Sequence, residues 1–168
     1  MFRYRGEYTL SRQYFKYDVR KYFEQYTSFE TKSVLDFGCN HGNFVRYQSH
    51  YDYTGIDINK AIIEENKEQY PGCEWIHYDG YNKMYNPNGT EELTLGRDYD
   101  VGVLFSVITH MEKDEAIETI RKLKERCKTL YVTFYSHTNQ QALNNICRFR
   151  KLVLPDWSKI TQSDVYAF

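Results

Sequence analysis

Short apolar runs and amphipathic segments alternate along this chain, and the alternation limits the folds open to it. Five runs have the length and the β-branched or aromatic content of buried strands: 33–37, 53–57, 74–78, 100–105 and 130–135. We expect a short helix through Phe44 and Val45, a helix that Asn59 can cap and that ends near Pro71-Gly72, and a helix over 116–127. Strands alternating with helices of this size predict an α/β fold with helices on both faces of a parallel sheet.

The segments around this alternating core complete a single predicted domain over 1–168. Residues 1–30 are expected to form an aromatic and basic helical segment that Ser11 could cap, with a core-facing stripe of Tyr14, Phe15, Val19, Tyr22, Phe23 and Tyr26. Residues 31–135 make up the predicted cofactor-binding core, and 136–168 offer one helix and a last strand within 159–168. The stretch 80–98 reads as a long loop, and loops of that length are usually functional or mobile.

The charge balance and the composition limit the kinds of partner that we expect for this protein. The 168 residues carry 22 Lys and Arg against 23 Asp and Glu, a formal net charge of −1. Proteins that coat nucleic acid usually have a basic surplus, so a nucleic-acid partner is disfavoured, although it stays open. No apolar run approaches the roughly 20 residues that cross a bilayer, and residues 1–7 are too polar for a signal peptide. We therefore expect no membrane partner and a cytoplasmic protein.

The most informative stretch is the glycine-containing turn that follows the first predicted strand. Glycines there let a ligand approach the backbone, and the start of a following helix offers free N–H groups. The turn lacks the G-x-G-x-x-G spacing of dinucleotide sites and the Lys-Ser/Thr of a P-loop. Asp57 ends the second strand, 21 positions after Asp36, where an acid can accept hydrogen bonds from ribose hydroxyls. Asp79 ends the third strand, one strand further out.

At these points the chain resembles the class I S-adenosylmethionine-dependent methyltransferases. The resemblance is carried by Val-Leu-Asp-Phe-Gly-Cys-Asn-His-Gly (34–42), Gly-Ile-Asp-Ile-Asn (55–59), His-Tyr-Asp-Gly (77–80) and Asp-Val-Gly-Val-Leu-Phe-Ser-Val-Ile-Thr-His-Met (100–111). It implies a Rossmann-like parallel-sheet sandwich and S-adenosylmethionine as cofactor. The end of the chain is short for the closing antiparallel hairpin of this family, which predicts an abbreviated C-terminal edge of the sheet.

The resemblance also implies the cofactor-binding residues. The first turn would line the methionine moiety, through Gly38, Cys39, Asn40 and Gly42. Asp57 would hold the ribose, with Ile58 against the adenine and with Asp79 and Gly80 at the adenine edge. Phe105 and Ser106 would close the site below the sulfonium. The chain departs from the family at Asn40, where glycine is usual, but Asn tolerates positive φ better than most residues.

Methyl transfer needs a positioned nucleophile more than a fixed catalytic motif, because the sulfonium is already activated. His110 follows the fourth strand, near where the methyl group should point, and is the candidate general base; a structural role in ordering its loop is the alternative. No close-spaced set of His, Asp and Glu supports a metal site. For Asp36 we expect a carboxylate that bonds nearby backbone N–H groups and so stabilises the turn.

Three functions are compatible with these sequence features, and the first is favoured. The first is a methyltransferase acting on oxygen or nitrogen of a small molecule or modest polar acceptor. The second is an S-adenosylmethionine-binding regulatory or catalytically lapsed module. The third is another nucleotide-binding Rossmann enzyme, such as an NAD-dependent one, against which the glycine spacing counts.

Overall fold

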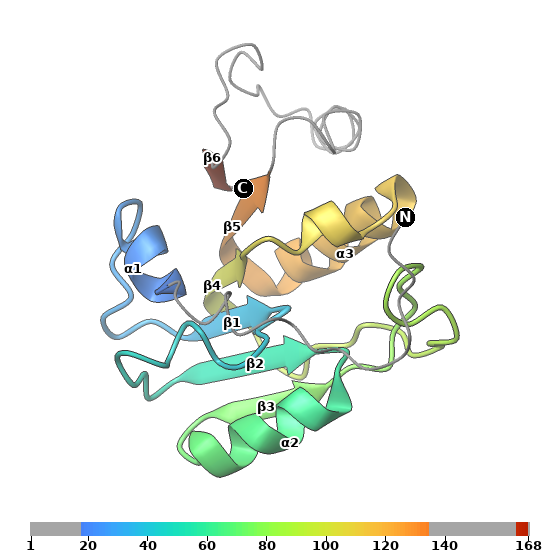
Figure 1. Cartoon of the computed structure of the whole chain (residues 1–168). Coiled ribbons are helices and arrows are strands. Elements are labelled where there is room, and N and C mark those ends of the chain that lie inside the picture. The colour runs from blue at the N-terminus through green and yellow to red at the C-terminus, as the bar shows by residue number, and fades with distance from the viewer. Residues whose placement is uncertain (1–17, 135–163, 168) are drawn as a thin grey trace.

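In the computed structural model, which describes residues 18–134 and 164–167, strands and helices alternate as the sequence pattern predicts (Figure 1). The elements are α1 (Val19–Glu24), β1 (Val34–Phe37), β2 (Tyr53–Asp57), α2 (Lys60–Gln69), β3 (Glu74–His77), β4 (Tyr99–Leu104), the 3-10 turn η2 (Ile108–His110), α3 (Lys113–Arg126), β5 (Cys127–Phe134) and β6 (Asp164–Ala167). No helix within these residues has the length and apolar content that a membrane crossing requires.

The described strands form one sheet in the order β3-β2-β1-β4-β5-β6. The first five run parallel, and β6 pairs antiparallel with β5. This confirms the predicted α/β, Rossmann-like architecture and a last strand near the end of the chain. Because the parallel strands point the same way, the carboxyl ends of β1 to β4 meet along one edge, where ligands of open α/β sheets bind.

Each face of the sheet carries its own apolar core, as expected for strands that alternate their side chains. On one face, Leu35, Leu104 and Leu130 pack with Ile120 of α3. On the other face, β-strand residues such as Val34 and Val103 pack with α1 and α2 in a cluster rich in aromatic rings. Figure 1 shows α2 alongside β3 and α3 beside β4 and β5. Helices thus cover both faces of the sheet.

Two sequence-based expectations are wrong in detail. Phe44 and Val45 lie in a turn rather than a helix, because Val45 N bonds back to Gly42 O and the Phe44 ring is fixed between Phe29 and Tyr53. Helix α1 ends at Glu24, so Tyr26 lies beyond it and is 48% exposed instead of joining the core. The expected cap at Ser11 and the expected helix after residue 136 fall outside the described residues.

The stretch between β3 and β4 contains no helix in the described structure and is anchored by its own side chains. Leu93 and Leu95 are both buried and join the core against α3. A short antiparallel bridge pairs Asn82 with Asn86. Two leucines thus replace the apolar face that a crossover helix would have supplied.

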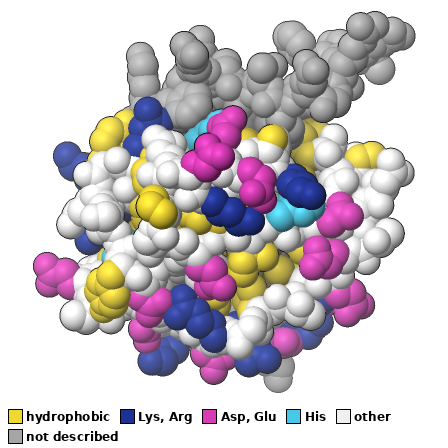
Figure 2. All heavy atoms as spheres, turned by 90° about the horizontal axis from the view of Figure 1, so that it is seen from below, with side chains coloured by type: hydrophobic (Ala, Val, Ile, Leu, Met, Phe, Trp, Pro, Cys, Tyr) yellow, Lys and Arg dark blue, Asp and Glu magenta, His cyan; other side chains and the backbone are white. Residues whose placement is uncertain are grey.

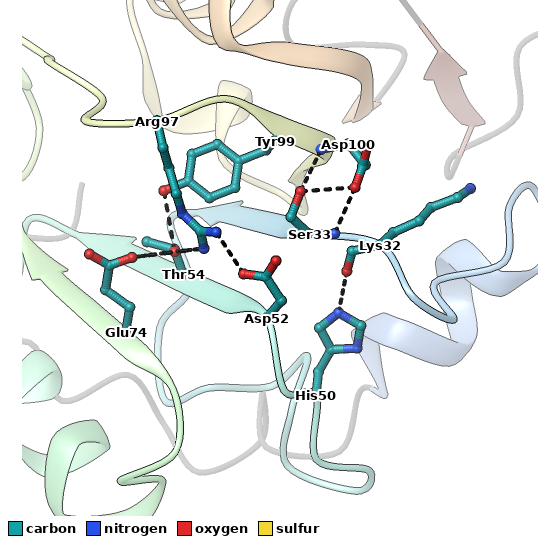
Figure 3. A network of polar contacts seen from close by, with 9 residues as sticks. All are labelled: Lys32, Ser33, His50, Asp52, Thr54, Glu74, Arg97, Tyr99 and Asp100. Carbon is teal, nitrogen blue, oxygen red and sulfur yellow. Dashed lines mark hydrogen bonds and ion pairs between the residues drawn. The ribbon is translucent and has the colours of Figure 1, made fainter.

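A polar network fixes the amino ends of the strands, on the edge opposite the glycine turn (Figure 3). Arg97 lies over the ring of Tyr99 at 4.5 Å and pairs with Asp52 at 2.7 Å. The fully buried Thr54 hydroxyl accepts from Arg97 and Tyr99 and donates to Glu74 at 2.7 Å. These groups satisfy one another, which makes this edge structural.

The same edge ties β1 to β4 through Ser33 and Asp100. The Asp100 carboxylate accepts from both the backbone N–H and the hydroxyl of Ser33, each at 3.0 Å. Hydrogen bonds from Lys128 and Ser33 lower the pKa of Asp100 to about 2. His50 completes the edge by bonding the carbonyl of Lys32 at 2.7 Å (Figure 3).

Candidate functional site

The turn after β1 depends on left-handed backbone conformations. Gly38, Asn40 and Gly42 have φ values of 77°, 50° and 67°. A Cβ on Gly38 would lie 2.4 Å from Cγ2 of Val107, and one on Gly42 would lie 2.8 Å from the ring of Tyr70. The two glycines are therefore required both by backbone conformation and by close packing.

Asn40 stands where the family usually has glycine, and the structure shows how the turn accommodates it. Its side-chain oxygen accepts from the N–H of His41 at 2.8 Å, the local bond that makes Asn tolerable at positive φ. Its carbonyl accepts from the side-chain amide of Asn66 at 2.6 Å. Asn66 is fully buried on α2, so a hydrogen bond from an interior amide holds the turn in place.

The backbone N–H groups of the turn are used inside the protein. Those of Gly38 and Cys39 donate to the carbonyl of Ile56, at 2.8 and 3.0 Å, and that of Gly42 donates to the carbonyl of Cys39. The N–H of Asn40 donates to Asp57, and that of His41 to the side chain of Asn40. The sequence-based expectation placed free N–H groups at the start of a helix after this turn. No helix begins there in the described structure, and the N–H groups of residues 38–42 are bonded within the protein.

Asp57 joins the turn to the end of β2. Its Oδ2 accepts from the N–H of Asn40 at 3.0 Å, and its Oδ1 accepts from the N–H of Asn59 at 2.9 Å. Burial raises the pKa of Asp57, and these backbone hydrogen bonds oppose the rise. The N–H of Ile58 also contributes a hydrogen bond to this carboxylate. A carboxylate has about four lone-pair positions, so these backbone donors do not fill all of them. Asp57 and the glycine turn thus form one bonded unit.

The remaining predicted residues of β2 and β3 continue along the same edge. The carbonyl of Ile58 bonds the ring of His77 at 3.2 Å, and the N–H of Tyr78 donates to the carbonyl of Asp57 at 3.0 Å. Asp79 is exposed, and its carboxylate accepts from the amide of Asn86 at 2.8 Å. The same amide bonds the carbonyl of Gly80.

Residues after β4 approach the turn from the other side. Ser106 has a φ of 60°, and its N–H donates to the hydroxyl of Thr133 at 2.7 Å. Val107 follows and faces Gly38. The ring of Phe105, by contrast, is packed edge-on against Tyr22 of α1, with centroids 5.2 Å apart. Its role below the sulfonium remains a prediction.

Asp36 differs from its expected role as a carboxylate bonded to backbone N–H groups. It lies within β1, is 3% exposed, and accepts a 2.7 Å hydrogen bond from the hydroxyl of Tyr53. Burial raises its pKa to about 7, against the lowering effect of Tyr53, and nearby Asp57 raises it further. Burial also raises the pKa of Cys39, so its thiol stays protonated and unreactive.

His110 belongs to η2, after β4, and is exposed. Desolvation by its neighbours lowers its pKa below the ordinary value of 6.5, so the imidazole is neutral at neutral pH. Its Nδ1 lies 2.8 Å from the hydroxyl of Tyr85 in the loop after β3. Among residues 18–134 and 164–167, no group of three or more His, Cys, Asp or Glu could hold a metal ion.

Sequence reasoning missed four residues at this edge. Val107 faces Gly38, Asn66 supports Asn40, and Asn86 bonds Asp79, while Tyr85 contacts His110. Each acts across a turn or between distant elements, so none has a local sequence signal. Tyr14 and Phe15 of the expected core-facing stripe fall outside the described residues.

Comparison with known proteins settles the family. The model of the family described as "Methyltransferase domain" matches residues 35–129, more than half of the chain. The chain belongs to this methyltransferase-domain family. No curated protein sequence matches it.

Solved structures with the same fold include distant methyltransferases. One is magnesium protoporphyrin IX methyltransferase from Synechocystis PCC 6803 with bound S-adenosylmethionine (TM-score 0.59, 15% identity, covering 82% of this chain and 67% of that one). Another is a TehB-like S-adenosylmethionine-dependent methyltransferase from Corynebacterium glutamicum (TM-score 0.58, 19% identity, 79% and 72% covered). A third is coclaurine N-methyltransferase bound to N-methylheliamine and S-adenosylhomocysteine (TM-score 0.52, 20% identity, 67% and 33% covered).

The family match bears out the expected methyltransferase family, and the solved structures bear out the expected Rossmann-like fold. Two of these structures are named for chemically different acceptors, magnesium protoporphyrin IX and coclaurine, so the shared fold does not dictate the acceptor. The roles of the individual site residues remain predictions.

Proposed function

We propose that this methyltransferase transfers a methyl group from S-adenosylmethionine to an oxygen or nitrogen atom of a small polar acceptor. The cofactor would lie across the carboxyl ends of β1, β2 and β3. The observation that carries the proposal is the bond between Asp57 and the N–H of Asn40, which makes a ribose-binding acid and a glycine turn one preformed unit.

The turn fits this cofactor better than it fits a phosphate-bearing one. Phosphate cradles present several free backbone N–H groups to the ligand. Here the N–H groups of Gly38 to Gly42 are all bonded internally, and the carboxylate of Asp57 lies against the turn. Such an environment disfavours a pyrophosphate and suits a ligand that carries a sulfonium and an ammonium. This argues against NAD or ATP.

When bound, S-adenosylmethionine supplies an electrophilic methyl group. The chain's own residues would then perform three tasks. Asp57 would accept the ribose hydroxyls on its free lone pairs, and Gly38 and Gly42 would allow close approach of the methionine moiety. His110 would remove the proton of the acceptor, which its neutral imidazole can do at pH 7.

A small acceptor agrees with the charge pattern of the surface. On the face drawn in Figure 2, acidic and basic side chains are interspersed, without a stripe of one sign. Nucleic-acid-binding proteins usually present clustered Lys and Arg. A nucleic-acid substrate therefore has no electrostatic support on this face.

The proposal is tested by titrating the full chain with S-adenosylmethionine in a calorimeter and by following labelled methyl transfer to a panel of small amines, phenols and carboxylates. We expect binding, and transfer to at least one acceptor whose rate rises with pH through the lowered pKa of His110 and is then flat. His110→Gln should slow turnover and leave cofactor affinity unchanged. Absence of binding would refute the proposal; binding with no transfer to any acceptor would indicate a binding module instead.

A further inference from the structure

The loop after β3 holds one tyrosine in a fixed place beside His110. Asn82 organises the loop: its side-chain oxygen accepts from the N–H groups of Met84 and Tyr85, at 3.1 and 2.8 Å. Its side-chain amide donates to the carbonyl of His110 at 3.0 Å and to Glu115 of α3 at 2.6 Å. Asn82 is 5% exposed, so this interior amide anchors both the loop and η2.

Tyr85 meets His110 through its hydroxyl and its ring. The hydroxyl oxygen lies 2.8 Å from Nδ1, and the two rings meet edge-on with centroids 5.2 Å apart. Within the described residues, no hydrogen bond or ion pair engages Nε2 of His110. Among these residues, one ring nitrogen of His110 thus has a hydrogen-bond partner and Nε2 has none.

The titratable groups around this pair are engaged with one another. Lys83 of the loop pairs with Glu112, which begins α3. Glu115 accepts from Asn82, and its burial raises its pKa. In the part of the chain that the structure describes, the Tyr85 hydroxyl is then the one group bonded to Nδ1, and a hydroxyl can either accept from Nδ1–H or donate to Nδ1.

We propose that Tyr85 is a positioning residue for His110: its hydroxyl oxygen accepts the hydrogen bond of Nδ1–H and thereby keeps the lone pair of Nε2 free for the proton of the acceptor. This rests on the proposed methyl transfer. In that step the acceptor's lone pair forms the bond to the methyl carbon, and the carbon–sulfur bond breaks with its electrons going to sulfur. The acceptor's proton moves to Nε2, and the resulting imidazolium returns it to water.

Nuclear magnetic resonance of the imidazole nitrogens tests the tautomer without any acceptor. In the unliganded full chain at a pH above the pKa of His110, we expect its Nδ1 to be protonated and its Nε2 to be unprotonated; His110→Gln identifies the signals. Tyr85→Phe should shift the population towards the Nε2–H tautomer. Tyr51→Phe is the control, because the ring of Tyr51 also lies against a histidine ring, that of His50, with centroids 5.5 Å apart.

Two results would overturn the proposal: an Nε2–H tautomer in the unmodified protein, or a tautomer that Tyr85→Phe leaves unchanged. With an acceptor found, Tyr85→Phe should lower kcat about tenfold or more with unchanged affinity for S-adenosylmethionine, and adding it to His110→Gln should cause no further loss, because residues acting as a unit are non-additive. Full loss of activity in Tyr85→Phe with an unchanged tautomer would likewise contradict the positioning role. A protein that binds no cofactor would refute the proposed function but would leave the tautomer result intact.

Discussion

Replacing Asp36 by asparagine should remove a large pH dependence from the stability of this protein. The carboxyl is buried against Tyr53, and its pKa rises from 3.8 to about 7 on folding. Between these two values the folded state keeps the proton and the unfolded state has lost it, so the free energy of unfolding falls as pH rises. About 3 pKa units at ~1.36 kcal/mol each amount to about 4 kcal/mol. This stabilisation is fully present below pH 3.8 and lost by pH 7.

Asparagine resembles the protonated carboxyl in shape and can still accept from Tyr53 but cannot ionise. Any fixed cost of its extra N–H groups is the same at every pH. Between pH 4 and pH 8, the free energy of unfolding of Asp36→Asn should therefore rise by about 4 kcal/mol relative to that of the unmodified protein. Urea unfolding, followed by the fluorescence of buried Trp75, measures the free energy of unfolding of both proteins at each pH. A difference that stays constant within about 1 kcal/mol across this range would refute the reasoning.

Two further substitutions test the fold around the site by the same urea unfolding. Leu95→Ala should cost about 2–4 kcal/mol, because it opens a cavity where the loop supplies the missing helix face; a loss below about 1 kcal/mol would show that the loop does not contribute to the core. Thr54→Val should cost about 1–3 kcal/mol, since it leaves Tyr99 without its acceptor and Arg97 with one partner fewer. An unchanged midpoint would mean that water replaces the lost hydroxyl.

The sequence was sufficient for the parallel strands, because each is a short run with β-branched or aromatic residues, bounded by polar or glycine-containing turns. It also predicted Asn59 as the cap of α2, which the structure confirms through bonds to Ala61 and Ile62. The helix at Phe44 was predicted from local pattern alone, and tertiary packing of that ring against Phe29 prevails instead.

The site was less predictable, because its bonds join residues far apart in the chain. Asp57 could be singled out by its place at the end of a strand, but its bond to Asn40 spans 17 positions. The partner of Asp36 is a tyrosine on the neighbouring strand, and the partner of His110 lies 25 positions earlier, in a loop without periodicity. Only the folded chain brings these groups together.

The central claim is that Asp57 holds the ribose of the cofactor at the glycine turn. Calorimetry should compare S-adenosylhomocysteine with its analogues that lack the 2′- or the 3′-hydroxyl, on the unmodified protein and on Asp57→Asn. We predict that losing at least one hydroxyl weakens binding about tenfold or more on the unmodified protein, as expected for a hydrogen bond to a charged acceptor, and that Asp57→Asn removes most of this difference. Equal affinity for all three ligands, or a penalty that Asp57→Asn leaves intact, would contradict the account.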